Sequence, residues 1–286
     1  SALRADATFR LAQRAFEAKD YAKAQTLTAE LLAGGLAPAV RQSGLYLSGQ
    51  IAIAQERWDD ARRTFEAFLQ DFPQSTHRPM AEFGVAEAIF RQGDYAEAAR
   101  RFERLAGQTE PRDASWAALV RLRLAQALCH QKKWKEALAI AGKIEKEYPQ
   151  FEEQYEADYV VGRCLADQAD FDAAREAYRK VIRSPGGAKT ETAAKAQLLI
   201  AESYYHQKNY EAALREYLRV EILYAFPALQ AAAALQAAHC HEKLGEWKEA
   251  ADLYARLIKT YPDSAQAKEA TQRLREAQQR AKANPE

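Results

Sequence analysis

The run His239-Cys240-His241-Glu242 is the densest group of side chains in this sequence that could bind a metal or act as a nucleophile. Imidazole nitrogens, a thiolate and a carboxylate are the ligands that zinc takes in proteins. On a helix, however, residues two apart point about 200° away from each other, so His239 and His241 would face opposite sides. We therefore predict buried structural roles in this run and no metal site.

No other residues are spaced as a recognisable reaction centre. The remaining cysteines, Cys129 and Cys164, fit neither a zinc motif nor a disulfide framework. The glycine pairs at 34–35 and 186–187 read as turns, not as a phosphate-binding loop. We expect no catalytic residues, no metal and no cofactor.

Composition points to an all-helical chain with no preference for polyanions. Of 286 residues, 61 are alanine, whereas Val, Ile and Thr together number 26. Alanine is the best helix former and β-branched residues favour strands. The net charge is +1, and no apolar run reaches the ~18 residues of a membrane span. The chain starts with Ser1 and its only methionine is Met80, so we expect either a removed leader or a trimmed sequence.

A repeat of 37 to 39 residues runs along nearly the whole chain. Its most visible element is a turn aromatic followed three residues later by alanine. The seven turn aromatics are Tyr21, Trp58, Tyr95, Trp134, Phe171, Tyr210 and Trp247. Nine residues before each stands Gly or Ala, and ten residues after it stands a large apolar residue. This register predicts helical hairpins, in which small residues allow two antiparallel helices to approach closely.

These positions resemble the tetratricopeptide repeat family, although the period is longer than the common 34 residues. The resemblance implies an all-α solenoid: a right-handed superhelical arc of seven hairpins plus a C-terminal capping helix, forming one domain over 1–286. The expected repeats span about 3–35, 39–72, 76–108, 112–148, 151–184, 189–225 and 228–261, with the capping helix at 264–281. Repeats that end in Tyr-Pro-Asp-Ser or Phe-Pro-Gln-Ser are similar to bacterial cell-envelope members, such as the TolA-binding coordinator and the outer-membrane assembly lipoproteins.

The resemblance also implies that the first helix of each hairpin lines a concave groove. Positions 12, 8 and 5 residues before each turn aromatic share one helix face and form an apolar row beside a polar row. The predicted partner-binding residues are Phe9, Tyr46, Gln50, Phe83, Glu87, Phe90, Leu122, Gln126, Tyr159, Arg163, Leu198, Glu202, Tyr205 and His239. Phe83, Phe90 and Tyr159 are the expected anchors. In the alternative interpretation, the aromatic residues only pack against neighbouring repeats.

We predict a non-catalytic scaffold that binds a protein or peptide segment in this groove, in a periplasmic or other cell-envelope complex in preference to the cytoplasm. Six basic and seven acidic side chains on the groove face make no basic stripe, so nucleic acid is not an expected partner, and neither is membrane insertion. The alternative is a self-assembling structural module whose main contact is homo-oligomeric.

Overall fold

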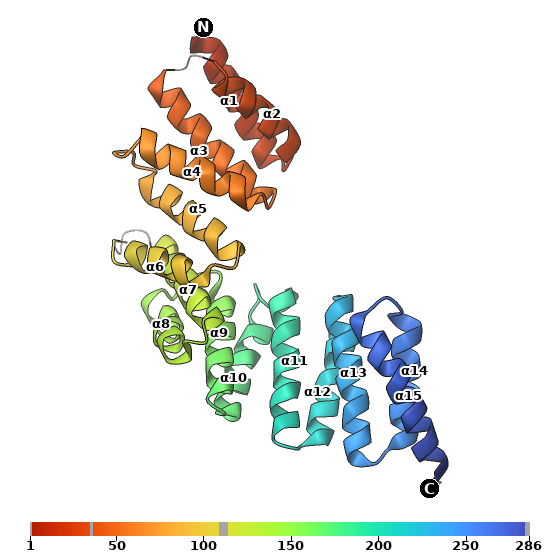
Figure 1. The fold of residues 1–286 in the computed structure, drawn as a ribbon. Coiled ribbons are helices and arrows are strands. Elements are labelled where there is room, and N and C mark those ends of the chain that lie inside the picture. The colour runs from red at the N-terminus through yellow and green to blue at the C-terminus, as the bar shows by residue number, and fades with distance from the viewer. Residues whose placement is uncertain (1, 35–36, 109–113, 284–286) are drawn as a thin grey trace. The chain divides into compact units, whose positions relative to one another are not determined.

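The computed structural model describes residues 2–34, 37–108 and 114–283, which form two compact units. Unit 1 extends to Lys133, and its described residues form seven helices (Figure 1). They are α1 (Ala2–Glu17), α2 (Tyr21–Leu32), α3 (Pro38–Ala54), α4 (Trp58–Asp71), α5 (Arg78–Arg91), α6 (Tyr95–Ala106) and α7 (Ala114–His130).

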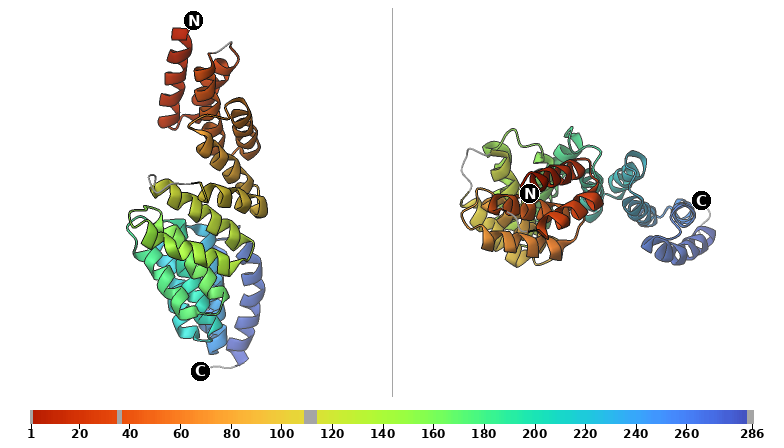
Figure 2. Two further views of the ribbon diagram at one scale, coloured as in Figure 1. Left: turned by 90° about the vertical axis from the view of Figure 1, so that its left-hand side faces the viewer. Right: turned by 90° about the horizontal axis from the view of Figure 1, so that it is seen from above.

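Unit 2 begins at Trp134, and the part of it that the structure describes forms eight helices (Figures 1 and 2). They are α8 (Trp134–Glu147), α9 (Gln154–Asp167), α10 (Phe171–Arg183), α11 (Glu191–His206), α12 (Tyr210–Leu223), α13 (Pro227–Leu244), α14 (Trp247–Thr260) and α15 (Ala265–Ala283). No residue in the described ranges belongs to a strand, which confirms the predicted all-α class. That the repeats form one continuous domain stays a prediction. None of the described helices combines the length and apolarity that crossing a membrane requires.

All seven hairpin turns close in the same way. Two residues before each turn aromatic, the backbone adopts a positive φ: at Lys19, Glu56, Gly93, Lys132, Ala169, Lys208 and Gly245. Its N–H donates three residues back and the next N–H donates five residues back, as in Ala169 to Ala166 and Asp170 to Leu165. This Schellman arrangement satisfies carbonyls at the end of the first helix. In four turns the following Asp or Asn then caps the second helix, as Asp170 does for the Ala173 N–H.

The core consists of the positions that the repeat register predicted. Every alanine three residues after a turn aromatic is fully buried, from Ala24 in α2 to Ala250 in α14. The Gly or Ala nine residues before each aromatic and the large residue ten after it are buried as well. Small side chains on one helix thus face large ones on the next, which lets consecutive helices pack closely.

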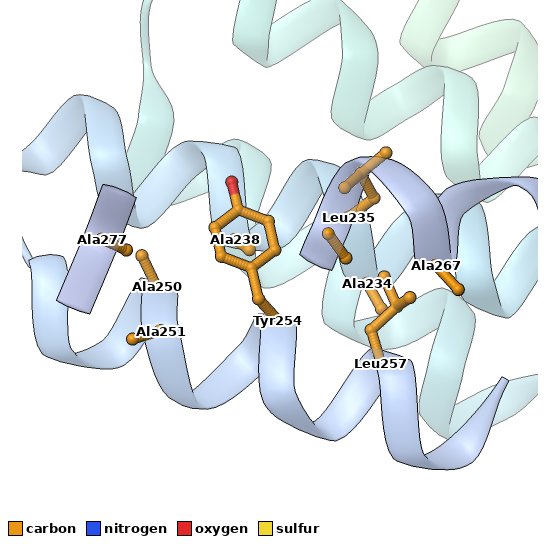
Figure 3. Packing of buried hydrophobic residues seen from close by; sticks show 10 residues of the cluster. Ala234, Leu235, Ala238, Ala250, Ala251, Tyr254, Leu257, Ala267 and Ala277 are labelled. Carbon is orange, nitrogen blue, oxygen red and sulfur yellow. The ribbon is translucent and has the colours of Figure 1, made fainter. Parts of the chain in front are cut away.

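Figure 3 shows this packing at the C-terminal end of unit 2, where Tyr254 of α14 lies beside Ala238 of α13. Ala267 and Ala277 of the capping helix α15 belong to the same buried cluster. The outward residues of α15 at Lys268, Gln272, Arg275 and Gln279 are polar and exposed. This helix therefore covers the apolar core and presents a hydrophilic surface, as a terminal helix of a repeat stack should.

Candidate functional site

Unit 1 carries an open hollow of about 400 Å³ between α4 and the first helices of its hairpins. Its lining comes from α1, α3, α4, α5 and α7. The lining residues are Phe16, Tyr46, Gln50, Ile53, Ala54, Phe65, Met80, Phe83, Gly84 and Trp116. None of them carries a charge, and most are aromatic or aliphatic.

Phe65 on α4 lies between the first helices of two successive repeats. A Cβ atom at Gly49 or Gly84 would lie 2.6 or 2.4 Å from its ring, so both glycines are needed to admit it. The ring centroids of Tyr46 and Phe65 are 5.9 Å apart, and those of Phe83 and Trp116 are 4.8 Å apart. These edge and tilted contacts stabilise the aromatic walls of the hollow in one arrangement.

A second hollow of about 240 Å³ shares Tyr46 and Gln50 with the first. Its lining is more polar: Phe9, Gln13, Gln42, Ser43, Tyr46, Leu47, Gln50, Phe68 and His77. Glutamine amides both donate and accept hydrogen bonds, so they can pair with the backbone of an extended segment. The two hollows together provide an apolar pocket beside a row of amide groups.

A buried carboxylate network lies on the same helices. Glu87 is nearly fully buried and accepts hydrogen bonds from Arg91 at 2.9 Å and from Arg123 at 3.0 Å. Arg123 also donates to Gln126 at 3.0 Å, and the Arg91 guanidinium lies 5.7 Å from the Trp58 ring. Glu87 and Gln126 are therefore engaged in a network within the protein, whereas Gln50 lines both hollows.

The structure gathers some of the predicted residues of unit 1 and not others. Phe9, Tyr46, Gln50 and Phe83 line one or both hollows. Phe90 lines neither of these two hollows and packs edge-on against Tyr95 at 5.3 Å and His130 at 5.6 Å. The prediction for Leu122 is wrong, because its side chain is 0% exposed and cannot reach a partner. The cause is that α7 is apolar on most of its circumference and buries more than one face.

Most residues that line the two hollows were not among the predicted set, and four large apolar ones on the first helices of the hairpins have a signal in the sequence. Phe16 and Ile53 belong to the row five residues before the turn aromatic, which the sequence already placed on the groove face. Met80 and Trp116 lie in the first turns of α5 and α7. A large apolar residue in the first turn of a first helix is the signal that could have found them.

In unit 2, the first helices of the hairpins are α9, α11 and α13. Their predicted site residues are more polar than those that line the hollows of unit 1. The Arg163 guanidinium lies 5.8 Å from the Trp134 ring, and the rings of Tyr159 and Tyr178 are 6.0 Å apart. Burial raises the pKa of the Glu202 carboxyl, although the nearby charges of His206 and Arg163 act in the opposite direction. This half-buried carboxylate differs from the uncharged lining of the hollows in unit 1.

The other predicted residues of unit 2 make local contacts. The rings of Tyr205 and Tyr210 meet edge-on at 5.3 Å, and Leu198 is partly buried against the core. His239 lies 3.4 Å from Glu269 of α15, and burial lowers the pKa of its imidazole.

The His239-Cys240-His241-Glu242 run does not gather into a reactive centre. Cys240 is fully buried, and burial raises the pKa of its thiol to about 12. His241 pairs with Glu246 at 2.5 Å, away from His239. Within the described residues, no three side chains of His, Cys, Asp or Glu lie close enough together to hold a metal ion.

The fold and the repeat register define a class of helical repeat proteins, and sequence comparison identifies the family. Residues 36–193 match the model of the tetratricopeptide repeat-like domain, and residues 162–229 and 232–264 match tetratricopeptide repeats. The chain belongs to the tetratricopeptide repeat family. Members of this family generally act as protein-interaction scaffolds and not as catalysts. No curated protein sequence matches the chain.

Solved structures agree on the fold. The apo form of RapI is 13% identical, with a TM-score of 0.70 over 98% of this chain and 86% of that one. The apo form of the quorum sensor NprR from B. thuringiensis is 12% identical, with a TM-score of 0.66 over 98% of this chain and 82% of that one. PilF of Pseudomonas aeruginosa is 16% identical, with a TM-score of 0.60 over 80% and 95%. At these identities the likeness establishes the helical repeat fold, and the resemblance to cell-envelope members is not confirmed.

Proposed function

We propose that the protein is a non-catalytic scaffold that binds an extended segment of a partner protein on the first-helix face of unit 1. The observation that carries the proposal is the 400 Å³ hollow with an uncharged, largely aromatic lining. Desolvated aromatic pockets supply much of the binding energy of protein interfaces. A large apolar side chain of the partner fits this hollow.

The neighbouring hollow supports an extended partner over a helical one. Gln13, Gln42 and Gln50 line it, and no Asp, Glu, Lys or Arg is among its lining residues. An extended segment has free backbone N–H and C=O groups that pair with these amides, whereas a helix has already used its own. The partner segment is therefore uncharged where it crosses Gln50, with an apolar anchor on one side.

We retain a bacterial cell-envelope complex as the proposed setting, supported by the repeat endings Tyr-Pro-Asp-Ser and Phe-Pro-Gln-Ser. A measured molecular mass in solution separates this scaffold from a self-assembling module. An affinity pull-down from the source cell identifies candidate partners.

The direct test uses peptides selected from a phage-displayed random library against the whole chain. Ala54→Phe fills the hollow from its wall, and Gln50→Glu places a charge between the two hollows. Each should weaken binding of the selected peptides by about tenfold or more while the helical content is retained. Arg179→Glu is the control. Arg179 lies on α10, which is the second helix of its hairpin in unit 2.

If Arg179→Glu abolishes binding while Ala54→Phe and Gln50→Glu do not change it, the partner site lies elsewhere. The proposal is also wrong if the library yields only charged peptides and neither Ala54→Phe nor Gln50→Glu changes their affinity.

A further inference from the structure

A third hollow in unit 1, of about 200 Å³, is lined by arginines. It lies among α4, α5 and α6, which follow one another in the fold (Figure 1). Its lining residues are Leu69, Arg78, Glu82, Arg101, Arg104 and Leu105. It shares no lining residue with the two hollows of the proposed function, and its charged lining gives it a chemistry that they lack.

The charges at this hollow leave a positive surplus. Arg78 pairs with Glu82 at 2.9 Å, and Arg101 donates to Glu97 at 2.7 Å. Each of these two guanidinium groups has more N–H donors than its bonds use. Arg104 is exposed, and its guanidinium has no ion pair or hydrogen bond among the described residues. The hollow therefore has a guanidinium group that no carboxylate of the described chain neutralises.

Unit 2 shows what a basic side chain at the position of Arg104 binds. Arg104 stands nine residues after its turn aromatic, as do Lys180 and Arg256. Lys180 of α10 donates to Glu145 of α8 at 2.7 Å. Arg256 of α14 donates to Glu221 of α12 at 2.7 Å. Both glutamates stand eleven residues after the turn aromatic of the preceding repeat, so this register places a carboxylate from one second helix on a cation of the next.

In unit 1 a leucine occupies the position of these glutamates. Leu69 stands eleven residues after the turn aromatic of α4, and it lines the hollow together with Arg104. Leu105, which is also in the lining, is buried. The hollow thus offers apolar contacts beside guanidinium groups. The methylene stem and the carboxylate of a glutamate side chain match these two features.

The chain offers Arg104 no substitute on its own helix. Arg219, at the same position in α12, likewise follows an apolar residue of the preceding second helix, Ile182. Arg219 pairs instead with Glu216, three residues before it, at 3.0 Å. Three residues before Arg104 stands another arginine, Arg101. The carboxylate that completes this site must therefore come from elsewhere.

We propose that this hollow binds a carboxylate side chain on an acidic segment of a partner protein, in the place that a glutamate of the chain itself takes in unit 2. Guanidinium and carboxylate groups form charge-assisted hydrogen bonds with matching planar geometry. The positive surplus favours a segment that carries several carboxylates, because complementary charges promote association. The site is separate from the two uncharged hollows, so the proposal goes beyond the proposed function.

Fluorescently labelled hexaglutamate is the probe, and hexaglutamine is its uncharged match. Anisotropy measured with the whole chain at low salt should show that hexaglutamine binds at least about tenfold more weakly than hexaglutamate. General attraction contributes little, because the net charge of the chain is only +1. Arg104→Glu should weaken hexaglutamate binding by about tenfold or more. Lys143→Glu is the matched control at the same position of the next repeat, where Lys143 is exposed, and it should leave the affinity nearly unchanged.

The sharpest test supplies the missing glutamate from the chain. Leu69→Glu should pair with Arg104 as Glu221 pairs with Arg256, and it should weaken hexaglutamate binding about as much as Arg104→Glu does. Leu69→Gln introduces a side chain of similar shape without the charge and should retain binding. Leu69→Glu should also melt at a higher temperature than Leu69→Gln, and Arg104→Gln should remove this difference, as a double-mutant cycle measures directly.

Three results would overturn the proposal: no binding of hexaglutamate, equal effects of Arg104→Glu and Lys143→Glu, or undiminished binding by Leu69→Glu. If Leu69→Glu loses its helical signal, the comparison of Arg104→Glu with Lys143→Glu decides. Displacement of hexaglutamate by inorganic phosphate, at concentrations where acetate has no effect, would assign the hollow to a phosphoryl group instead. Ala54→Phe and Gln50→Glu should leave hexaglutamate binding unchanged, so this proposal and the proposed function fail separately.

Discussion

The Cε2 atom of Phe65 lies 2.4 Å from the place where a Cβ atom of residue 84 would be, if Gly84 carried one. A Cβ atom at Gly49 would meet the same ring at 2.6 Å from the other side. Phe65 thus occupies space that two glycines on neighbouring first helices leave empty, and it forms part of the hollow in unit 1.

Gly84→Ala should lower the free energy of unfolding by about 1–3 kcal/mol, because the added methyl group overpacks the ring. Gly142→Ala in α8 is the control, since a Cβ atom there meets nothing within 4 Å. It should raise stability by roughly 0.5–1 kcal/mol through helix propensity. Thermal denaturation measures both, and a shift of the same sign in the two variants would contradict the packing argument.

Ala169→Gly should stabilise the protein by up to about 1 kcal/mol, because φ at Ala169 is 60° and left-handed backbone costs an L-residue energy that glycine avoids. Gly245→Ala is the reverse experiment, at a turn where φ is 84°. It should destabilise the protein. Urea denaturation midpoints that move in the same direction for both variants would be inconsistent with this account of the turns.

Ala174→Leu should destabilise unit 2 by about 1–3 kcal/mol, because Ala174 is fully buried where α10 meets its neighbours. Ala139→Leu, at an exposed position of α8, should change stability by less than about 0.5 kcal/mol. The measurement is chemical denaturation followed by circular dichroism. Coincident curves for wild type and Ala174→Leu would show that the helices can move apart freely at this point.

Glu202→Gln should stabilise the protein at neutral pH and lose that advantage in acid. Burial raises the folded pKa of Glu202 above the 4.5 of an ordinary glutamate. Between these two values the folded state holds more protons than the unfolded state, so stability falls as pH rises through this window. Glu103→Gln, at an exposed position, is the control. Melting temperatures measured across about pH 4 to 8 test whether Glu202→Gln is more stable than wild type only above the pH range between the two pKa values.

The three cysteines should react with a thiol reagent only after unfolding. Cys129, Cys164 and Cys240 are all buried, and burial raises the pKa of Cys240 to about 12, so the reactive thiolate is scarce at pH 8. The rate of reaction with Ellman's reagent should rise sharply in denaturant. Rapid labelling of Cys240 in the native protein would show that α13 opens readily.

The amino-acid sequence by itself determined the hairpins, their turns and their core. Each repeat has a turn aromatic, with alanine three residues later, Gly or Ala nine residues before it and a large residue ten after it. These residue types bring consecutive helices into close contact. These contacts are local in sequence, and each repeat meets the same requirement. For that reason Ala24, Ala174 and Ala250 are buried as the register predicts.

Only the tertiary structure decided which of the predicted groove residues line hollows and which are buried or held by other side chains. Tyr46, Gln50 and Phe83 line hollows, whereas Leu122 is buried and Glu87 is held by two arginines. The register gives Phe83 and Leu122 the same position, so it cannot separate them. Exposure there depends on side chains that come from other repeats, such as Trp116 against Phe83, and on the glycines that admit Phe65 between two helices. Such contacts join residues far apart in the chain, and a periodic pattern carries no information about them.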